Sequence, residues 1–423
     1  MPERPLDAVI IGAGQAGLAT SYHLHAAGVQ HVVLEAGRIG ETWRSQRWDS
    51  FHLNTPSWMN RLPGESEPAA PDAFASQAAF VAQLEAYAQR FELPVRTSTA
   101  VREVRSRPGG GHYRIELEGG DRLAARAIVV AAGTQRVPRM PALATALPGR
   151  IASLPSAAYR NSRALPEGAV LVVGSGQSGA QIAEDLLDAG RAVYLCTSRV
   201  GRAPRRYRGR DMLTWLADVG FWDQRPEDLP DPALTRAPQP LISGVGPLGH
   251  TVSLQDLAAR GVTLLGRPTA ISGAHVTLDA SVATNMAFGD ERSAAFRVLV
   301  DEWLQRQGRP LPALEPDPAD APHPDPTSFA SPATLDLDRA GVRTVIWATG
   351  VQGDLSWLRV PGALDGDGSP VHRDGVGEVP GLSFIGMPWL SRRKSGIIFG
   401  VAHDAEIVAH HLTAYIGAHR SRR

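Results

Sequence analysis

Near its start the chain reads Val9-Ile10-Ile11-Gly12-Ala13-Gly14-Gln15-Ala16-Gly17, an apolar run followed at once by a Gly-x-Gly-x-x-Gly turn. The apolar run predicts a buried strand of a parallel sheet, and the pattern turns helical from Ala16 onward. Gly12 permits the tight turn, Gly14 lets a backbone approach a pyrophosphate, and Gly17 lets the helix pack on the strand. Because the first helical turn offers free N–H groups and the positive end of a helix dipole, the stretch predicts phosphate binding.

A second apolar run, His31-Val32-Val33-Leu34, ends in Glu35. This is close to the spacing of about 20 residues at which an acid reaches a ribose hydroxyl. By itself the glycine triplet is equally typical of an ordinary strand–turn–helix unit. Strand, turn, helix, strand and acid all agree here, so the sequence predicts that this unit holds an adenine dinucleotide.

The same pattern returns in the middle of the chain. An apolar run over 169–173 leads into Gly174-Ser175-Gly176-Gln177-Ser178-Gly179, followed by a helical pattern and another apolar run. No carboxylate stands where Glu35 stands in the first unit; Ser198 and Arg199 follow the strand instead. An acid suits a bare ribose hydroxyl, whereas arginine suits a 2′-phosphate, so the contrast predicts FAD at the first turn and NADPH at the second. A basic surface loop is the alternative, because further arginines lie nearby: Arg202, Arg205, Arg206 and Arg208.

Composition excludes several classes of function. The chain has 423 residues, 43 of them basic and 43 acidic, so it is long enough for two or three domains and shows no charge signature of nucleic-acid binding. Its one cysteine, Cys196, excludes a disulfide framework and a redox-active dithiol. The first five residues lack the features of a signal peptide, and no run approaches the roughly 20 apolar residues of a membrane span. We therefore expect a cytoplasmic protein with no membrane or nucleic-acid partner; its histidines show no metal-ligand spacing.

The overall pattern predicts an α/β fold with two Rossmann-like units. Further predicted elements are helices over 78–91, 254–259, 294–307 and 404–416, a hairpin over 113–125, and strands over 127–131, 262–265, 344–350 and 382–386. Residues 309–332 are rich in Pro, Asp and Ala, which predicts an extended connector that returns the chain to the first domain. The expected domains are 1–150 and 333–423, two parts of one FAD-binding unit, and 151–332, the NADPH-binding unit.

Two features have more than one interpretation. Trp215, Phe221 and Trp222 stand between Pro- and Asp-rich turns, and packing between domains is favoured over a substrate pocket for them. Lys394 is the only lysine among 43 basic residues, which hints at a role that arginine cannot fill, although chance survival is the alternative. A cation beside the turn over 395–400 would stabilise negative charge on a cofactor, so Lys394 is a candidate catalytic residue.

The two glycine turns, together with Leu53-Asn54-Thr55-Pro56 and Ala348-Thr349-Gly350, resemble the class B flavoprotein monooxygenases. This family includes the flavin-containing monooxygenases, the YUCCA-type enzymes and the Baeyer–Villiger monooxygenases, and the chain looks most like its bacterial branch. The resemblance implies a glutathione-reductase-like architecture, in which an NADPH domain is inserted into a discontinuous FAD domain. It leaves a homodimer open as the assembly.

The resemblance also implies roles for individual residues. Asn54 matches the family asparagine near the oxygen-reactive edge of the flavin and is the second candidate catalytic residue. Trp43 and Arg44 match the segment beside the flavin, and 348–350 match the motif that links the domains. Further cofactor contacts are expected from Gln15, Ala16, Ala36, Gly40, Thr42, Val101, Ala132, Gly133, Gln177, Ser178, Ser198, Gly386, Gly396 and Ile397.

One stretch departs from the family pattern. The family fingerprint places a phenylalanine, a glycine, a histidine and an aromatic residue between the two glycine turns. Here Gly149 and Tyr159 remain, but Leu147 replaces the phenylalanine and Pro155 stands where the histidine is expected. The departure argues against a Baeyer–Villiger enzyme and puts efficient oxygenation in doubt.

These observations leave three functions open. In the first, NADPH reduces FAD, oxygen adds to give a flavin hydroperoxide, and a small organic substrate is oxygenated at a nitrogen, a sulfur or a carbonyl-adjacent centre. A dry cavity must then protect the hydroperoxide. The second is an uncoupled NADPH oxidase or flavin reductase, which the Pro155 departure keeps open. The third is a nucleotide-sensing regulator without turnover.

Overall fold

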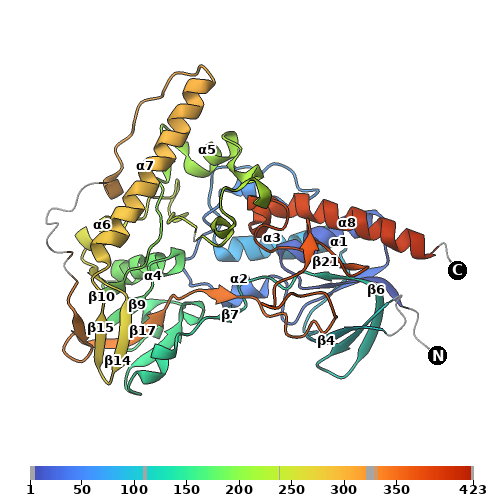
Figure 1. Ribbon diagram of the computed structural model, residues 1–423, viewed down its shortest axis with the longest axis horizontal. Helices are drawn as coiled ribbons and strands as arrows, with labels where there is room; N and C mark the ends of the chain where they lie inside the picture. Colours follow the sequence, from blue (N-terminus) through green and yellow to red (C-terminus); the bar gives the residue numbers. More distant parts are fainter. Residues whose placement is uncertain (1–4, 108–111, 238, 321–328, 330, 421–423) are drawn as a thin grey trace.

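The computed structural model describes residues 5–107, 112–237, 239–320, 329 and 331–420, which form two main sheets with helices packed on them (Figure 1). Figure 1 shows the sheet with β9, β10 and β17 on the left and the sheet with β6 and β21 on the right. Two predictions fall partly outside the described residues. Residues 1–4 belong to the amino-terminal stretch in which we expect no signal peptide, and most of 321–330 belongs to the predicted connector. None of the described helices combines the length and apolar character that crossing a bilayer requires.

The first sheet has the strand order β19-β20-β21-β6-β1-β2-β3, and a β4–β5 hairpin pairs with β6. Neighbours from β21 to β3 run parallel; Ile10, for example, pairs with Val33 on one side and Val129 on the other. The strands are β1 (Leu6–Ile11), β2 (His31–Leu34), β3 (Val95–Arg96), β4 (Val101–Ser106), β5 (Tyr113–Leu117), β6 (Arg122–Val130), β19 (His372–Arg373), β20 (Val376–Gly377) and β21 (Leu382–Phe384).

The second sheet is parallel throughout and has the order β13-β10-β9-β17-β8. Its central strand β9 pairs with β10 on one side and β17 on the other. The strands are β8 (Ala152–Pro155), β9 (Ala169–Val173), β10 (Val193–Cys196), β13 (Thr263–Leu265) and β17 (Val342–Trp347). Smaller sheets join β7 (Val137–Pro138) with β18 (Val351–Gln352), and β14 (Pro268–Ser272) and β16 (Thr334–Asp336) with β15 (His275–Leu278).

The helices cover these sheets as their apolar faces require. Successive residues of β1 point to opposite faces, so Ile10 packs in the layer with Leu18 and Leu412, while Val9 packs with Val104 of the hairpin. The helices are α1 (Gln15–Ala26), α2 (Glu41–Ser45), α3 (Gln77–Arg90), α4 (Gln177–Asp188), α5 (Met212–Asp218), α6 (Leu254–Ala259), α7 (Val282–Arg306) and α8 (Ile398–Arg420). The mixed α/β fold with two Rossmann-like units is confirmed.

The strand pairing corrects the predicted return to the first sheet. β16 and β17 both lie beyond residue 332, yet β16 pairs with β15 and β17 lies between β9 and β8. The chain therefore rejoins the first sheet only after Trp347. Further differences concern length: the predicted strand over 127–131 is part of the longer β6, and the helices predicted over 294–307 and 404–416 begin earlier, at Val282 and Ile398.

Both glycine turns pack on an alanine at the end of a neighbouring strand. A Cβ on Gly12 would lie 2.4 Å from the carbonyl oxygen of Ala131, and one on Gly174 would lie 2.6 Å from that of Ala348. A Cβ on Gly17 would lie 1.9 Å from the carbonyl oxygen of Gly12. These approaches leave no room for a side chain, so the glycines are required by packing.

We expect Gly17→Ala to lower the melting temperature of the cofactor-free protein, because the added methyl group has no space. Overpacking of this kind costs about 1–3 kcal/mol, the opposite sign to the gain that Gly→Ala brings in an open helix. Gly14→Ala is the matched control, since its Cβ would meet nothing within 4 Å. Equal melting temperatures for the two variants would contradict the close approach.

Candidate functional site

A single cavity of about 1340 Å³ is lined by residues from both glycine turns. Small-molecule sites usually measure about 300–1,000 Å³, so this cavity has room for more than one ligand. Most of the predicted cofactor contacts line it: Gly12, Gly14, Gln15, Ala16, Glu35, Ala36, Gly40, Thr42, Trp43, Asn54, Val101, Ala132, Gly133, Gln177, Ser178, Arg199, Gly386, Gly396 and Ile397.

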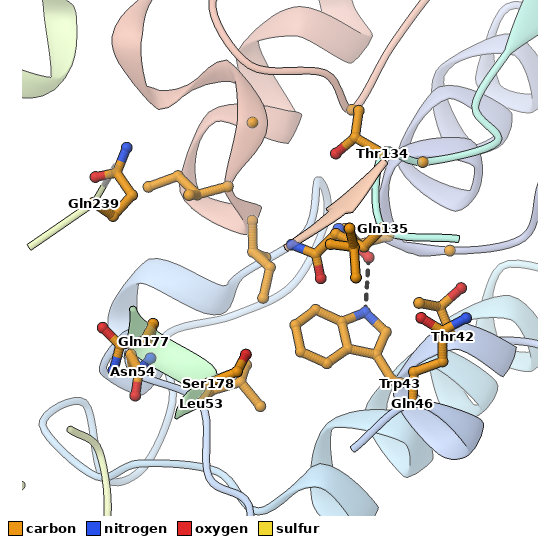
Figure 2. Close-up of a pocket in the computed structure, with 18 of the residues that line it drawn as sticks. Thr42, Trp43, Gln46, Leu53, Asn54, Thr134, Gln135, Gln177, Ser178 and Gln239 are labelled. Atoms are coloured by element: carbon orange, nitrogen blue, oxygen red, sulfur yellow. Dashed lines mark hydrogen bonds between the residues drawn. The ribbon is translucent and has the colours of Figure 1, made fainter. Parts of the chain in front are cut away.

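In the first turn, the Glu35 carboxylate is held by the backbone. Its Oε2 accepts a hydrogen bond from the N–H of Ala13 and its Oε1 accepts one from the N–H of Gly37, each at 2.8 Å. Each oxygen keeps a second lone pair, so the carboxylate can still accept from two ribose hydroxyls. Figure 2 shows Trp43 in this part of the cavity, and its indole N–H donates to Gln15 Oε1 at 3.0 Å.

In the second turn, a hydroxyl replaces the carboxylate. The N–H of Ser175, which corresponds to Ala13, donates to Ser198 Oγ at 3.2 Å, and the N–H of Ser198 donates back to Ser175 Oγ at 2.9 Å. The loop is therefore closed without a negative charge. Ser198 itself does not line the cavity, so its part in the site is to hold the turn.

Two arginines, one following β10 and the other on α7, stack on the same aromatic ring. Arg199 Cζ lies 4.4 Å from the ring centroid of Phe288, and Arg292 Cζ lies 5.0 Å from the same centroid. All three side chains line the cavity. Within the described ranges Arg199 has no carboxylate partner, and Arg292 has only its exposed neighbour Glu291. These guanidinium groups are available to a bound anion.

The other four arginines of this region are engaged by carboxylates. Their pairs are Arg202 with Asp290 and Asp320, Arg205 with Asp211, Arg206 with Glu315, and Arg208 with Asp301. The alternative of a basic surface loop therefore does not describe this group, because each of these side chains has a structural partner.

Asn54 connects the two units. Its Oδ1 accepts hydrogen bonds from Gln181 Nε2 at 3.0 Å and from the N–H of Gly244 at 3.2 Å, and its backbone carbonyl accepts from Arg205 Nη1 at 2.7 Å. Because both bonds use the oxygen, the Nδ2 group of this cavity-lining residue is left as a donor. Figure 2 shows Asn54 beside Gln177. A Cβ on Gly244 would lie 1.9 Å from the carbonyl oxygen of Leu53, so only glycine permits this crossing.

Some predicted residues lie outside the cavity lining. Gly17, Gly174, Gly176 and Gly179 shape the turns, and Thr349 Oγ1 donates to the carbonyl of Arg139 in the connection between the sheets, with Ala348 and Gly350 on either side. Arg44 pairs with Glu85 and donates to the carbonyl of Ile39.

The position of Lys394 does not support a catalytic role. Its Nζ donates to Asp223 Oδ1 at 2.7 Å and lies 5.1 Å from the ring of Phe399, and the residue does not line the cavity. It joins the 3₁₀ turn Arg393–Gly396 to the 3₁₀ turn Phe221–Asp223 (η5). A compact ammonium group fits the contact with Asp223 and Phe399, so the presence of lysine at this position is explained by packing.

Pro155, which stands where the family pattern has a histidine, is part of a strand of the second sheet. Pro155 is the last residue of β8 and pairs with Trp347 of β17. Tyr159 is buried, and its hydroxyl donates to Asp185 Oδ2 of α4 at 2.5 Å. Between them Ser156 and Ala157 line the cavity, so the site presents small side chains in this segment.

Sequence reasoning missed several cavity residues. Phe288 and Arg292 lie in the part of α7 whose start was not predicted, because the pattern over 282–293 contains Gly, Asn and Asp. Arg47 stacks on Trp43 with Cζ 4.9 Å from the ring centroid, and burial lowers its pKa to about 10.

The single cysteine of the chain lies outside the cavity lining. Cys196 is buried, which raises the pKa of its thiol to about 12 and makes the thiol unreactive.

The segment that crosses Leu53 is fastened to α4 by an ion pair. His250 Nε2 lies 2.9 Å from Glu184 Oε2, and this hydrogen bond raises the pKa of His250 although burial and Arg260 lower it. The His250 and Arg260 contacts in turn hold the pKa of the largely buried Glu184 below its ordinary value. The pair therefore stays charged to a higher pH than a free histidine and carboxylate would.

We expect this pair to stabilise the fold below the ordinary pKa of histidine and to lose its contribution as the pH rises through the raised pKa of His250. Thermal unfolding of wild type and His250→Gln, compared at about pH 6 and about pH 9, measures the effect. The difference between the two melting temperatures should shrink at the higher pH. A difference that is independent of pH would contradict the charged pair.

Comparison with known proteins agrees with this geometry. A family model described as pyridine nucleotide-disulphide oxidoreductase matches residues 9–217. The chain is 31% identical to an oxidoreductase described as CzcO-like from Geobacillus kaustophilus (strain HTA426), over 95% of this chain and 96% of that protein. It is also 31% identical to indole-3-pyruvate monooxygenase YUCCA1 of Oryza sativa subsp. japonica, over 57% of this chain and 60% of that protein. A flavin-containing monooxygenase from Stenotrophomonas maltophilia shares the fold, with a TM-score of 0.63 at 21% identity over 97% of this chain and 99% of that one.

Proposed function

Because this chain belongs to the CzcO-like oxidoreductases and is a class B flavoprotein monooxygenase-like protein, we propose that it is an FAD-dependent, NADPH-consuming monooxygenase of a small organic substrate. The observation that carries the proposal is a contrast in charge between the two turns within one cavity. In the first turn the backbone N–H of Ala13 donates to the carboxylate of Glu35, and in the second the N–H of Ser175 donates to the neutral hydroxyl of Ser198. The guanidiniums of Arg199 and Arg292 line the same cavity over the ring of Phe288. A cytoplasmic location and a homodimer stay predictions.

The residues of the first turn fit FAD. The free N–H groups at the start of α1 suit a pyrophosphate, and a Cβ on Gly14 would meet nothing within 4 Å, which leaves space for close approach. The free lone pairs of Glu35 suit a ribose. When bound, FAD would supply the two-electron and oxygen chemistry, and this chain's own residues would bind it, orient it and exclude water.

The residues of the second turn fit NADPH. Its loop is closed by a neutral hydroxyl, so no negative charge opposes a 2′-phosphate, and two guanidiniums are oriented by the same ring. Asn54 then lies where donors from its Nδ2 group can meet an oxygen atom in the cavity. Its amide is fixed by groups from the second unit, so the donor is oriented before any ligand binds.

An uncoupled NADPH oxidase is the second candidate, and Pro155 is the observation that favours it. A proline side chain cannot donate or accept a hydrogen bond, so it cannot perform the role that the family pattern gives to a histidine. The two candidates differ in product. The oxidase returns all electrons from NADPH as hydrogen peroxide, whereas the monooxygenase transfers one oxygen atom to the substrate.

The proposed function is tested with the purified, FAD-loaded protein. NADPH added without oxygen should bleach the flavin absorbance, and readmission of air with a range of uncharged and charged organic compounds should give an oxidised product with little peroxide. Bleaching followed by peroxide alone with every compound would favour the oxidase. A protein that stays colourless in FAD would overturn both candidates.

We expect Arg199→Gln to weaken NADPH binding by about 10- to 150-fold, which corresponds to about 1.5–3 kcal/mol for a charge-assisted hydrogen bond. Arg292→Gln should weaken it in the same direction, and neither change should affect NADH. Calorimetric titration with NADPH and with NADH measures the two affinities. Arg306→Gln is the control for the loss of one positive charge, because Arg306 is an exposed residue of α7, the helix that carries Arg292. Equal losses for NADPH and NADH would refute contact with the 2′-phosphate.

We expect Gln181→Glu to raise the fraction of NADPH electrons released as peroxide. A carboxylate only accepts hydrogen bonds, so Asn54 would turn its Nδ2 group toward residue 181 and away from the cavity. Peroxide per NADPH consumed should rise severalfold, measured at saturating NADPH because the new carboxylate also lines the cavity. In an Asn54→Ala background the same substitution should add nothing; a further increase there would show that Gln181 does not act through Asn54.

A further inference from the structure

One wall of the cavity belongs to neither glycine turn. It is formed by α5, η5, the middle of α7 and the residue that precedes α8, and its lining side chains are apolar: Met212, Leu216, Trp222, Phe296, Leu299 and Ile397. These residues belong to a hydrophobic cluster separate from the cores under the two sheets. We call them the apolar wall. In Figure 1, α5 and α7 rise above the two sheets, and the start of α8 lies below α5.

The apolar wall presents no charge to the cavity. Over 212–222, 295–299 and 396–398, none of the described residues that line the cavity is ionisable. Arg202 lines an adjoining part, but its guanidinium is held by Asp290 and Asp320. Asp231 also lines the cavity, and its carboxylate accepts the N–H of Ala233 at 2.8 Å.

We propose that the apolar wall is the substrate site and that it selects uncharged, ring-bearing organic molecules. The inference rests on the proposed function, because the two turns must hold the nucleotides for this wall to remain free. The rings of Trp222 and Phe296, together with the half-buried Phe221, offer faces and edges to a substrate ring. A charged group buried here would lose its water without gaining a partner, which costs several kcal/mol.

This charge selection separates the chain from part of its relatives. The YUCCA1 relative is named for indole-3-pyruvate, a keto acid. The carboxylate of such an acid needs a cation, and the apolar wall offers none, while Arg199 and Arg292 are assigned to the 2′-phosphate. The wall therefore favours a ketone or a thioether over a keto acid of the same ring.

The test uses the FAD-loaded enzyme with saturating NADP⁺, so that the arginines of the second turn are occupied. Calorimetry gives the dissociation constants of phenylacetone, phenylpyruvate and 2-phenylethylamine, which share a ring and differ in charge. The ketone should bind at least tenfold more tightly than either charged compound. Equal or tighter binding of the acid or the amine would overturn the charge selection.

Two neighbouring substitutions on α7 locate the site. Leu299→Trp fills the cavity at the apolar wall and should weaken phenylacetone binding at least tenfold without changing the flavin content. Val298→Trp is the matched control, because Val298 is 55% exposed and does not line the cavity. Equal affinities in the two variants would overturn the assignment of the wall.

The two proposals fail in different ways. If NADPH bleaches the flavin but none of the three compounds binds, the substrate site is overturned and the proposed function stands. If the protein stays colourless in FAD yet binds phenylacetone in a Leu299-dependent way, the wall is a binding site and the proposed function is overturned.

Discussion

The fold depends on the contact between a glycine turn and the end of the neighbouring strand. Gly12 lies against Ala131, Gly174 lies against Ala348, and each approach is too close for a Cβ atom. The same contact therefore occurs twice, once in each sheet, and it requires a small residue on both sides. The contact also explains the motif over 348–350, which follows β17. Ala348 packs against Gly174 of the second turn, and the segment after it leads back to the first sheet.

A second constraint joins the two units around the cavity. The backbone at 242–244 crosses that at Leu53, where only glycine fits, and Arg205 donates to the carbonyl of Asn54 while Asp211 pairs with the guanidinium. A buried guanidinium is expensive without such partners, so its position is well defined. Asn54 is consequently oriented by residues far away in sequence, because both of its side-chain hydrogen bonds come from the second unit.

The sequence predicted the parts of the structure that depend on local pattern. Buried strands such as β2 and β9 and the two glycine turns followed from apolar runs and glycine spacing, and β2 and β9 have the predicted bounds. What depends on distant contacts was not predicted. The pairing of β17 with the second sheet is set by register with β9, and the early start of α7 is hidden by residues of low helix propensity. Lys394 shows the limit of composition, since its rarity pointed to chemistry and its contact with Asp223 is structural.

The arginines near the second turn differ in whether their charge is neutralised. A chain with equal numbers of basic and acidic residues can neutralise nearly every guanidinium, and Arg202, Arg205 and Arg208 are neutralised in this way. Arg199 is stacked on an aromatic ring instead, which fixes a cation without removing its charge. A positive charge that is oriented but not neutralised suits an anion that comes and goes. The apolar wall, by contrast, has neither charge nor counter-charge, so two parts of one cavity lining are suited to ligands of opposite character.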